Sequence, residues 1–214
     1  MMLWKLLFTG LLCVAALALA VSRQASVYWL ALAAVVLSWF GDATLAGFKP
    51  LTRAMSQPSL WGLGFFAVAH LCYILAFTMY IKAWAQPGWR TPAMIAGFTA
   101  AAVALWLLIC SGGGQPAPLR AAALVYTLVL MMMSCMAWVS AMRLGGFVWP
   151  FALGSALFII SDGMIAMEWF RDWSFPWQDA AVWATYAPAQ LLLVIGFWML
   201  KMPEAASALA SAGM

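Results

Sequence analysis

Seven long apolar segments, separated only by short polar breaks, are the feature that most restricts how this chain can fold. A helix of about 20 apolar residues crosses a bilayer, and seven segments reach this length: 3–22, 27–47, 59–84, 91–111, 118–142, 146–170 and 176–200. Only 7% of the 214 residues are charged, whereas a soluble domain carries roughly a quarter. The sequence therefore predicts an all-α transmembrane bundle of about seven spans over residues 1–200, with no soluble domain and a flexible tail at 201–214.

The first segment also fits a second interpretation. It matches the pattern of a signal peptide with its small-residue cleavage site, because Lys5 is followed by an apolar run and then by "ALA" at 18–20. A polytopic protein needs no cleavable signal, so we count the segment as the first span and keep cleavage as an alternative. With seven spans, five basic residues fall on each side of the membrane, and the positive-inside rule therefore assigns no orientation.

The few charged and metal-binding side chains exclude several classes of function. The net charge of +4 comes from single basic residues scattered over the breaks, so no nucleic-acid partner is expected. The four cysteines lie inside apolar segments without paired spacing, and there is one histidine. Neither a disulfide framework nor a zinc site is indicated. We expect no metal and no cofactor, and the sequence leaves the oligomeric state open.

Three ionisable residues lie inside the apolar segments rather than at their ends. They are Asp42 in "WFGDATLAGF", His70 in "FFAVAHLCYILAF" and Asp162 in "FIISDGMIA". A carboxylate in the bilayer interior costs about 3 kcal/mol on insertion scales, so such a residue usually faces the protein interior and marks a functional site. Each residue alone also fits a structural role, as a hydrogen-bonding contact between two helices. The functional interpretation gains weight if the side chains meet.

Depth in the membrane predicts that they do meet. At 1.5 Å per residue, Asp42 lies about 8 Å below one membrane face, His70 about 16 Å and Asp162 about 12 Å. Tyr186, in the last span, lies about 15 Å below the same face. Four groups from four different spans are therefore expected in one half of the bilayer.

Polar neighbours extend this predicted pocket. Tyr73 follows His70 by three residues, so both side chains share one helix face. Gln190 follows Tyr186 by four residues and shares its face in the same way. We take the two aspartates as the catalytic candidates. The supporting or substrate-binding candidates are His70, Tyr73, Ser161, Tyr186 and Gln190.

Four sequence blocks resemble, in order, the signature blocks of the YhhN family. They are "FGD" at 40–42, "FFAVAHLCYILAF" at 65–77, "GSALFIISDGMIA" at 154–166 and "YAPAQLLLVIG" at 186–196. The family includes the lysoplasmalogenases, membrane enzymes that hydrolyse the vinyl ether bond of lysoplasmalogens to a fatty aldehyde and a glycerophospho-base. The resemblance places the two intramembrane aspartates of the family on Asp42 and Asp162, and its histidine on His70. Its tyrosine and glutamine fall on Tyr186 and Gln190.

The N-terminal part departs from the family pattern. Typical members have eight spans, with a Lys-Pro-Leu segment opening the helix before the one that carries Gly-Asp. Here "KPL" stands at 49–51, after Asp42, and one span precedes that of Asp42. The resemblance therefore implies that this part is shorter by one helix. That difference affects the wall facing the lipid and the orientation, and leaves the four blocks intact.

The activity implied by the resemblance needs a proton donor and a carboxylate. Vinyl ether hydrolysis starts with proton transfer to the alkenyl carbon, which gives an oxocarbenium ion; water then adds and the hemiacetal collapses. A carboxylic acid beside a carboxylate performs comparable chemistry in glycosidases. We assign Asp162, the deeper residue, as the acid and Asp42 as the base or cation stabiliser. Three basic loop residues on this side of the membrane are candidates for holding the lipid phosphate: Lys49, Arg53 and Arg171.

The predicted partners are a lysophospholipid substrate, water and the bilayer, and the predicted location is the cell membrane, the inner one in a bacterium. Two other classes of function stay open. A proton-coupled small-molecule transporter would use Asp42, His70 and Asp162 as a proton relay. A non-enzymatic membrane protein would use them as structural contacts. Release of aldehyde from lysoplasmalogen by the purified protein separates the enzyme from both.

Overall fold

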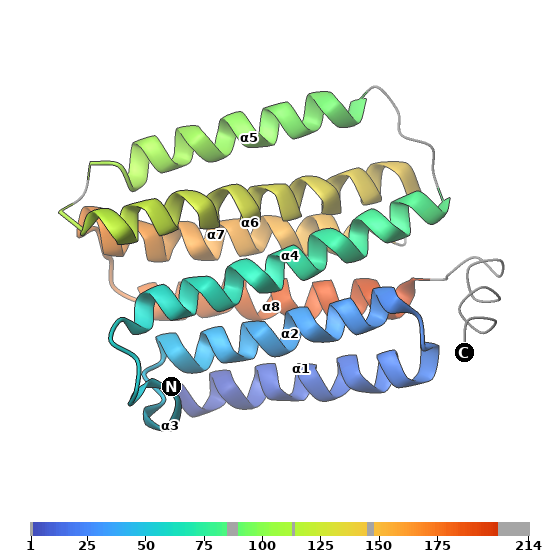
Figure 1. Cartoon of the computed structure of the whole chain (residues 1–214), viewed down its shortest axis with the longest axis horizontal. Coiled ribbons are helices and arrows are strands. Elements are labelled where there is room, and N and C mark those ends of the chain that lie inside the picture. Colours follow the sequence, from blue (N-terminus) through green and yellow to red (C-terminus); the bar gives the residue numbers. More distant parts are fainter. Residues whose placement is uncertain (1, 85–89, 113, 145–147, 201–214) are drawn as a thin grey trace.

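The computed structural model describes residues 2–84, 90–112, 114–144 and 148–200, and within them it contains helices and no strand. The helices (Figure 1) are α1 (Met2–Arg23), α2 (Ser26–Leu45), α3 (Lys49–Thr52), α4 (Pro58–Trp84), α5 (Arg90–Ile109), α6 (Ala117–Leu144), α7 (Trp149–Arg171) and α8 (Gln178–Met199). All except α3 are long and apolar enough to cross a membrane, which gives 7 spans. The predicted all-α fold with seven spans is thereby confirmed. The predicted tail, residues 201–214, lies outside the described residues.

The break between α2 and α4 holds a short helix that hydropathy did not predict. Gly47 turns the chain after α2 with a φ of 70°, a left-handed conformation that glycine adopts without a Cβ clash. Its N–H donates to the Thr44 carbonyl at 3.1 Å. Pro50 stands in the first turn of α3, where its missing N–H leaves no hydrogen bond unmade. One turn of helix buries no residue, so it has no apolar stripe that a sequence pattern detects.

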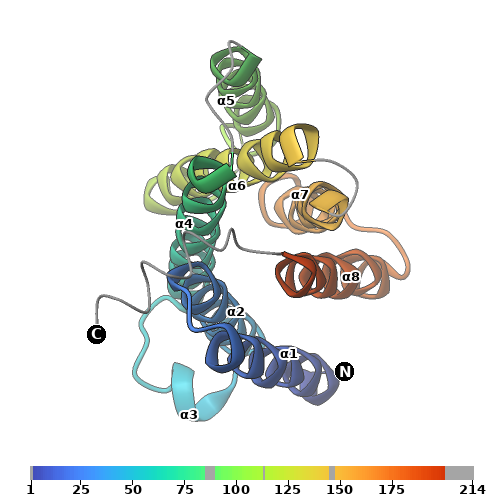
Figure 2. The same ribbon diagram turned by 90° about the vertical axis from the view of Figure 1, so that its right-hand side faces the viewer.

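Six of the described spans form a closed ring, and α5 lies outside it. Neighbouring helices in contact run in the order α1, α2, α4, α6, α7, α8 and back to α1, as the end-on view shows (Figure 2). α5 packs along α6, and 6% of its apolar window is buried, against 28% to 50% for the other spans. Side chains from several helices therefore meet inside the ring. We call the membrane face at which α1 begins and α2 ends the first face, and the opposite one the second face.

An aromatic cluster fills the ring interior from mid-membrane toward the second face. It consists of Tyr73, Phe77, Phe151 and Phe197, each at most 1% exposed. The Phe77 ring lies 4.8 Å from that of Phe151 and 5.7 Å from that of Phe197, between centroids. Gly196 permits this packing, because a Cβ there would lie 2.4 Å from the Phe151 ring. Asp42 and Asp162 lie outside this cluster, toward the helix ends at the first face.

Candidate active site

A cavity of about 290 Å³ lies in the half nearer the first face; residues of all six ring helices line it, and so do Leu105 and Ile109 of α5. Its wall is mostly apolar, and both candidate carboxyl groups, those of Asp42 and Asp162, line it. Leu45 and Phe170, close to helix ends at the first face, line it as well. So does Leu130, which lies about 20 Å along α6 from that face. The cavity therefore reaches from near the first face to the middle of the bilayer.

Asp42, near the end of α2, is held by a chain of hydrogen bonds from α8 and α4. The Tyr186 hydroxyl donates to Asp42 Oδ2 at 2.9 Å, and Gln190 Nε2 donates to the Tyr186 oxygen at 3.1 Å. The Tyr73 hydroxyl in turn donates to Gln190 Oε1 at 3.5 Å. Tyr186 and Gln190 lie one turn apart on α8, so both side chains point into the ring. The structure thus brings together four of the residues singled out from the sequence.

Asp162, on α7, has a separate set of partners. The Tyr126 hydroxyl of α6 donates to Asp162 Oδ2, and His70 Nε2 of α4 lies 3.2 Å from the Tyr126 oxygen. A tyrosine hydroxyl has one proton to donate. Because that proton goes to Asp162, His70 Nε2 must supply the hydrogen of the second bond. His70 Nδ1 is buried and has no hydrogen-bond partner among the described residues. His70 therefore supports the carboxyl group through Tyr126 rather than by direct contact.

Aromatic rings connect these two sets of hydrogen bonds. The Phe158 ring lies edge to face with the His70 ring at 4.8 Å and with the Tyr186 ring at 5.3 Å, between centroids. The Phe66 ring contacts both Phe158 and Tyr186, each at 6.2 Å. A Cβ on Gly41 would lie 2.6 Å from the Phe66 ring, so α2 needs a glycine here to approach α4 this closely. Ring packing thus couples the positions of the two carboxyl groups.

Ser161 lies next to Asp162 and lines the cavity. Its hydroxyl donates to the Val182 carbonyl of α8 at 3.3 Å. Contacts of this kind between small polar side chains and a neighbouring helix are common in membrane bundles. The hydroxyl therefore joins α7 to α8 beside the carboxyl group.

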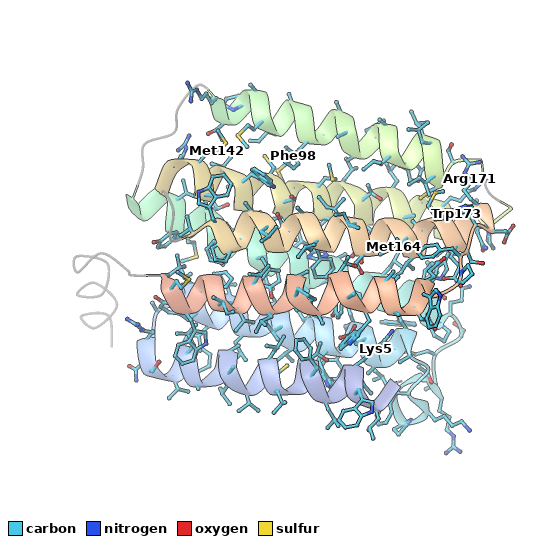
Figure 3. All side chains as sticks on the ribbon, turned by 180° about the vertical axis from the view of Figure 1, so that it is seen from behind. Lys5, Phe98, Met142, Met164, Arg171 and Trp173 are labelled. Atoms are coloured by element: carbon cyan, nitrogen blue, oxygen red, sulfur yellow. The ribbon has the colours of Figure 1, made fainter. Side chains whose placement is uncertain are left out.

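The three basic residues predicted to bind phosphate are not among the described residues of the cavity wall. Lys49 and Arg53 are exposed, at α3 and directly after it. Arg171 is exposed at the end of α7, beside the end of α5 (Figure 3). Its guanidinium donates to the Leu108 carbonyl of α5. Their binding of a headgroup stays a prediction from the sequence.

Two residues of the site were missed in the sequence. Tyr126 lies about 14 Å along α6 from the first face, close to the depth of about 12 Å expected for Asp162. A depth comparison that included every tyrosine would have made it a candidate, but not its contact with Asp162. Lys5 lines the cavity together with the two carboxyl groups. It gave no signal, because a cation at the end of a span is ordinary.

The chemistry available here is proton transfer by two carboxyl groups with hydroxyl and amide partners. Among the described residues, no three histidine, cysteine, aspartate or glutamate side chains are gathered in a way that could hold a metal ion. The four cysteines are free thiols, and none of them donates or accepts in the hydrogen-bond sets around Asp42 and Asp162.

These features define an integral multi-pass membrane protein in which two carboxyl groups from different helices line one cavity within the helix bundle. The model of the YhhN family matches residues 1–197, so the chain belongs to the YhhN family. The resemblance drawn from the four sequence blocks is confirmed.

Curated relatives match most of the chain. Over 185 aligned residues it is 31% identical to lysoplasmalogenase TMEM86B of Mus musculus. The aligned region covers 86% of this chain and 70% of the relative. Over 185 aligned residues it is 29% identical to lysoplasmalogenase TMEM86B of Rattus norvegicus. Here the aligned region covers 86% of this chain and 68% of the relative. No solved structure matches the chain.

Proposed function

We propose that this protein is a membrane hydrolase that cleaves the vinyl ether bond of a lysoplasmalogen, giving a fatty aldehyde and a glycerophospho-base. Family membership and the name of its relatives support a lysoplasmalogenase-like activity. The observation that carries the proposal is the pair Asp42 and Asp162, from two different helices, on the wall of one mostly apolar cavity. We place the protein in the cell membrane, which is the inner membrane in a bacterium.

The order of groups along the cavity suits a single-chain lipid. Asp42 lies about 5 Å from the first-face end of α2, and Asp162 about 14 Å from that of α7. Apolar residues such as Leu130 and Ile159 line the deeper part. In a lysolipid the headgroup stays near the surface, the vinyl ether follows the glycerol, and the hydrocarbon chain extends inward. A lipid in this orientation places its vinyl ether between the depths of the two carboxyl groups.

In the mechanism we propose, Asp162 is the acid and Asp42 the carboxylate. Asp162 transfers its proton to the alkenyl carbon, and the resulting oxocarbenium ion is stabilised by Asp42. Water adds to the cationic carbon and gives its proton to Asp42. When the hemiacetal collapses, its hydroxyl proton returns to Asp162 and the Asp42 proton passes to the departing glycerol oxygen. Each carboxyl group is then restored, as in other acid–carboxylate pairs.

Tyr126 and Tyr186 are positioning residues in this scheme. Tyr126 bonds to Asp162 Oδ2, which leaves Oδ1 as the atom that presents the proton to the alkenyl carbon. Tyr186 bonds to Asp42 Oδ2 at 2.9 Å, which leaves Oδ1 for the water. His70 bonds to the Tyr126 hydroxyl and Gln190 to the Tyr186 hydroxyl, so each tyrosine is held in place by a second residue. A site whose acid and base are held this way loses less entropy on reaching the transition state.

Separate asparagine substitutions test the proposal. Asp42→Asn and Asp162→Asn keep size and hydrogen bonding but remove the carboxyl proton and charge, so we expect each to abolish aldehyde release from lysoplasmalogen. As structural contacts alone, they would cost about 1 kcal/mol of stability and leave turnover intact. Asp179→Asn is the matched control, because Asp179 is exposed at the start of α8 on the same membrane face. Turnover above a few per cent in either asparagine variant, measured in detergent at matched protein concentration, contradicts the pair.

A further inference from the structure

We propose that Lys5 binds the phosphate group of the lipid substrate inside the cavity. This inference rests on the proposed function and specifies how that site recognises its substrate. Among the described residues that line the cavity, Lys5 is the one basic side chain. The binding chemistry it offers is that of an ammonium ion toward a phosphodiester, the group shared by choline and ethanolamine lysophospholipids.

The position of Lys5 inside the ring is unusual for a cation at the end of a span. Its Nζ lies 5.6 Å from the centroid of the Trp183 ring of α8, so the side chain crosses from α1 to α8 (Figure 3). A cation at a span end normally turns outward to the headgroups. Here the Trp183 ring, which contacts Phe8 of α1 at 5.5 Å and Tyr186 at 6.0 Å, holds the ammonium on the cavity side.

The depth of Lys5 matches the place of the phosphate in the substrate. Lys5 lies about 5 Å from the start of α1, level with Asp42 at about 5 Å from the end of α2. Asp162 lies deeper, at about 14 Å, and apolar residues follow it. Going inward, the wall therefore offers a cation, two carboxyl groups and hydrocarbon. A lysoplasmalogen offers a phosphate, a vinyl ether and an alkyl chain in the same order.

A rival role for Lys5 is that of a counter-ion to Asp42, with no contact to substrate. The two roles separate in kinetics. A phosphate contact is equal in ground state and transition state, so its loss raises KM and leaves kcat unchanged. Loss of a counter-ion removes a positive charge beside the Asp42 carboxylate, which takes part in the proposed reaction, and therefore changes kcat. The counter-ion role also predicts equal effects on lipids with and without a phosphate.

Binding of two lipids that lack a vinyl bond tests the proposal independently of hydrolysis. We would measure affinities for 1-O-alkyl-glycerophosphocholine and 1-O-alkylglycerol by competition with a fluorescent lysolipid in one nonionic detergent. Lys5→Met keeps the length of the side chain and removes the charge. We expect it to weaken binding of the phospholipid about 10- to 150-fold, the range for one charge-assisted hydrogen bond, with alkylglycerol binding unchanged. Lys5→Arg should retain most of the affinity.

Arg23→Gln is the control, because Arg23 is exposed at the other end of the same helix; its binding should match the wild type. Lys49→Gln, Arg53→Gln and Arg171→Gln test the loop cations in the same series. Equal losses for both lipids, or wild-type phospholipid affinity in Lys5→Met, would overturn the proposal. So would a wild-type protein that does not bind the phospholipid. If Lys5→Met selectively loses the phospholipid but wild-type protein releases no aldehyde, the proposed hydrolysis fails and the phosphate site stands.

Discussion

Replacing Tyr126 with phenylalanine tests how the structure holds its deeper carboxyl group. The change removes one oxygen atom from a buried position and leaves the ring in place. Two hydrogen bonds are lost with it, the one donated to Asp162 and the one accepted from His70. No residue already placed in contact with the substrate is altered.

The expected size of the effect follows from these two bonds. In the proposed mechanism the Asp162 carboxyl group becomes charged as its proton leaves. A hydrogen bond to a charged group contributes about 1.5–3 kcal/mol, and each 1.4 kcal/mol corresponds to tenfold in rate. If the bond orients Asp162 for proton transfer, kcat should fall roughly 10- to 150-fold. His70 is 0% exposed, so its Nε2–H is left buried without an acceptor. We expect that loss to lower the free energy of unfolding by about 1–3 kcal/mol.

Tyr28→Phe provides the matched control. Tyr28 is also buried, at 1% exposure, and its hydroxyl donates to the Leu200 carbonyl at 3.2 Å. That bond lies at the second face, far from the carboxyl groups. We would measure aldehyde release and thermal unfolding of both variants in the same detergent. Both should lose stability, and Tyr126→Phe alone should lose kcat with KM little changed. Equal kcat values in the two variants would refute the positioning role of Tyr126.

Two further predictions follow from the packing around Asp42. Gly41→Ala forces a Cβ to within 2.6 Å of the Phe66 ring; we expect about 1–3 kcal/mol of destabilisation and a lower kcat, because Phe66 contacts Tyr186. The control is Gly64→Ala, because no atom lies within 4 Å of the new Cβ. Equal melting temperatures in the two variants would show that the predicted clash is absent. Gln190→Leu removes the partner of both Tyr186 and Tyr73 and should lower kcat about tenfold, the effect of about 1.4 kcal/mol; wild-type turnover would mean that Tyr186 orients Asp42 unaided.

Hydropathy predicted the spans because the bilayer imposes the same requirement on each of them. A segment must be apolar for about 20 residues to cross, and that property is visible in a single sequence. Depth is equally visible, because a helix rises 1.5 Å per residue. Depth alone was enough to place Asp42 and Tyr186 in the same half of the bilayer, and the structure joins them by a hydrogen bond of 2.9 Å.

Lateral position could not be predicted in the same way. These spans are apolar on the lipid side and on the ring side, so no amphipathic stripe marks which face turns inward. The sequence therefore did not reveal that α5 lies outside the ring. Nor did it reveal that Tyr126 of α6 faces Asp162 of α7, or that Lys5 turns toward α8 rather than toward the headgroups. Each of these depends on which helix stands beside which.

The aromatic cluster of Tyr73, Phe77, Phe151 and Phe197 has a consequence for the leaflets of the membrane. Because these rings fill the bundle toward the second face, we expect the lipid substrate of the proposed hydrolase to reach the carboxyl groups from the leaflet at the first face. By the same reasoning, we expect its water-soluble product to leave to the aqueous compartment on that side. For the hydrolase we propose, turnover is then vectorial: in sealed vesicles with uniformly inserted protein, lysoplasmalogen placed in the leaflet at the second face should persist until it flips across the bilayer.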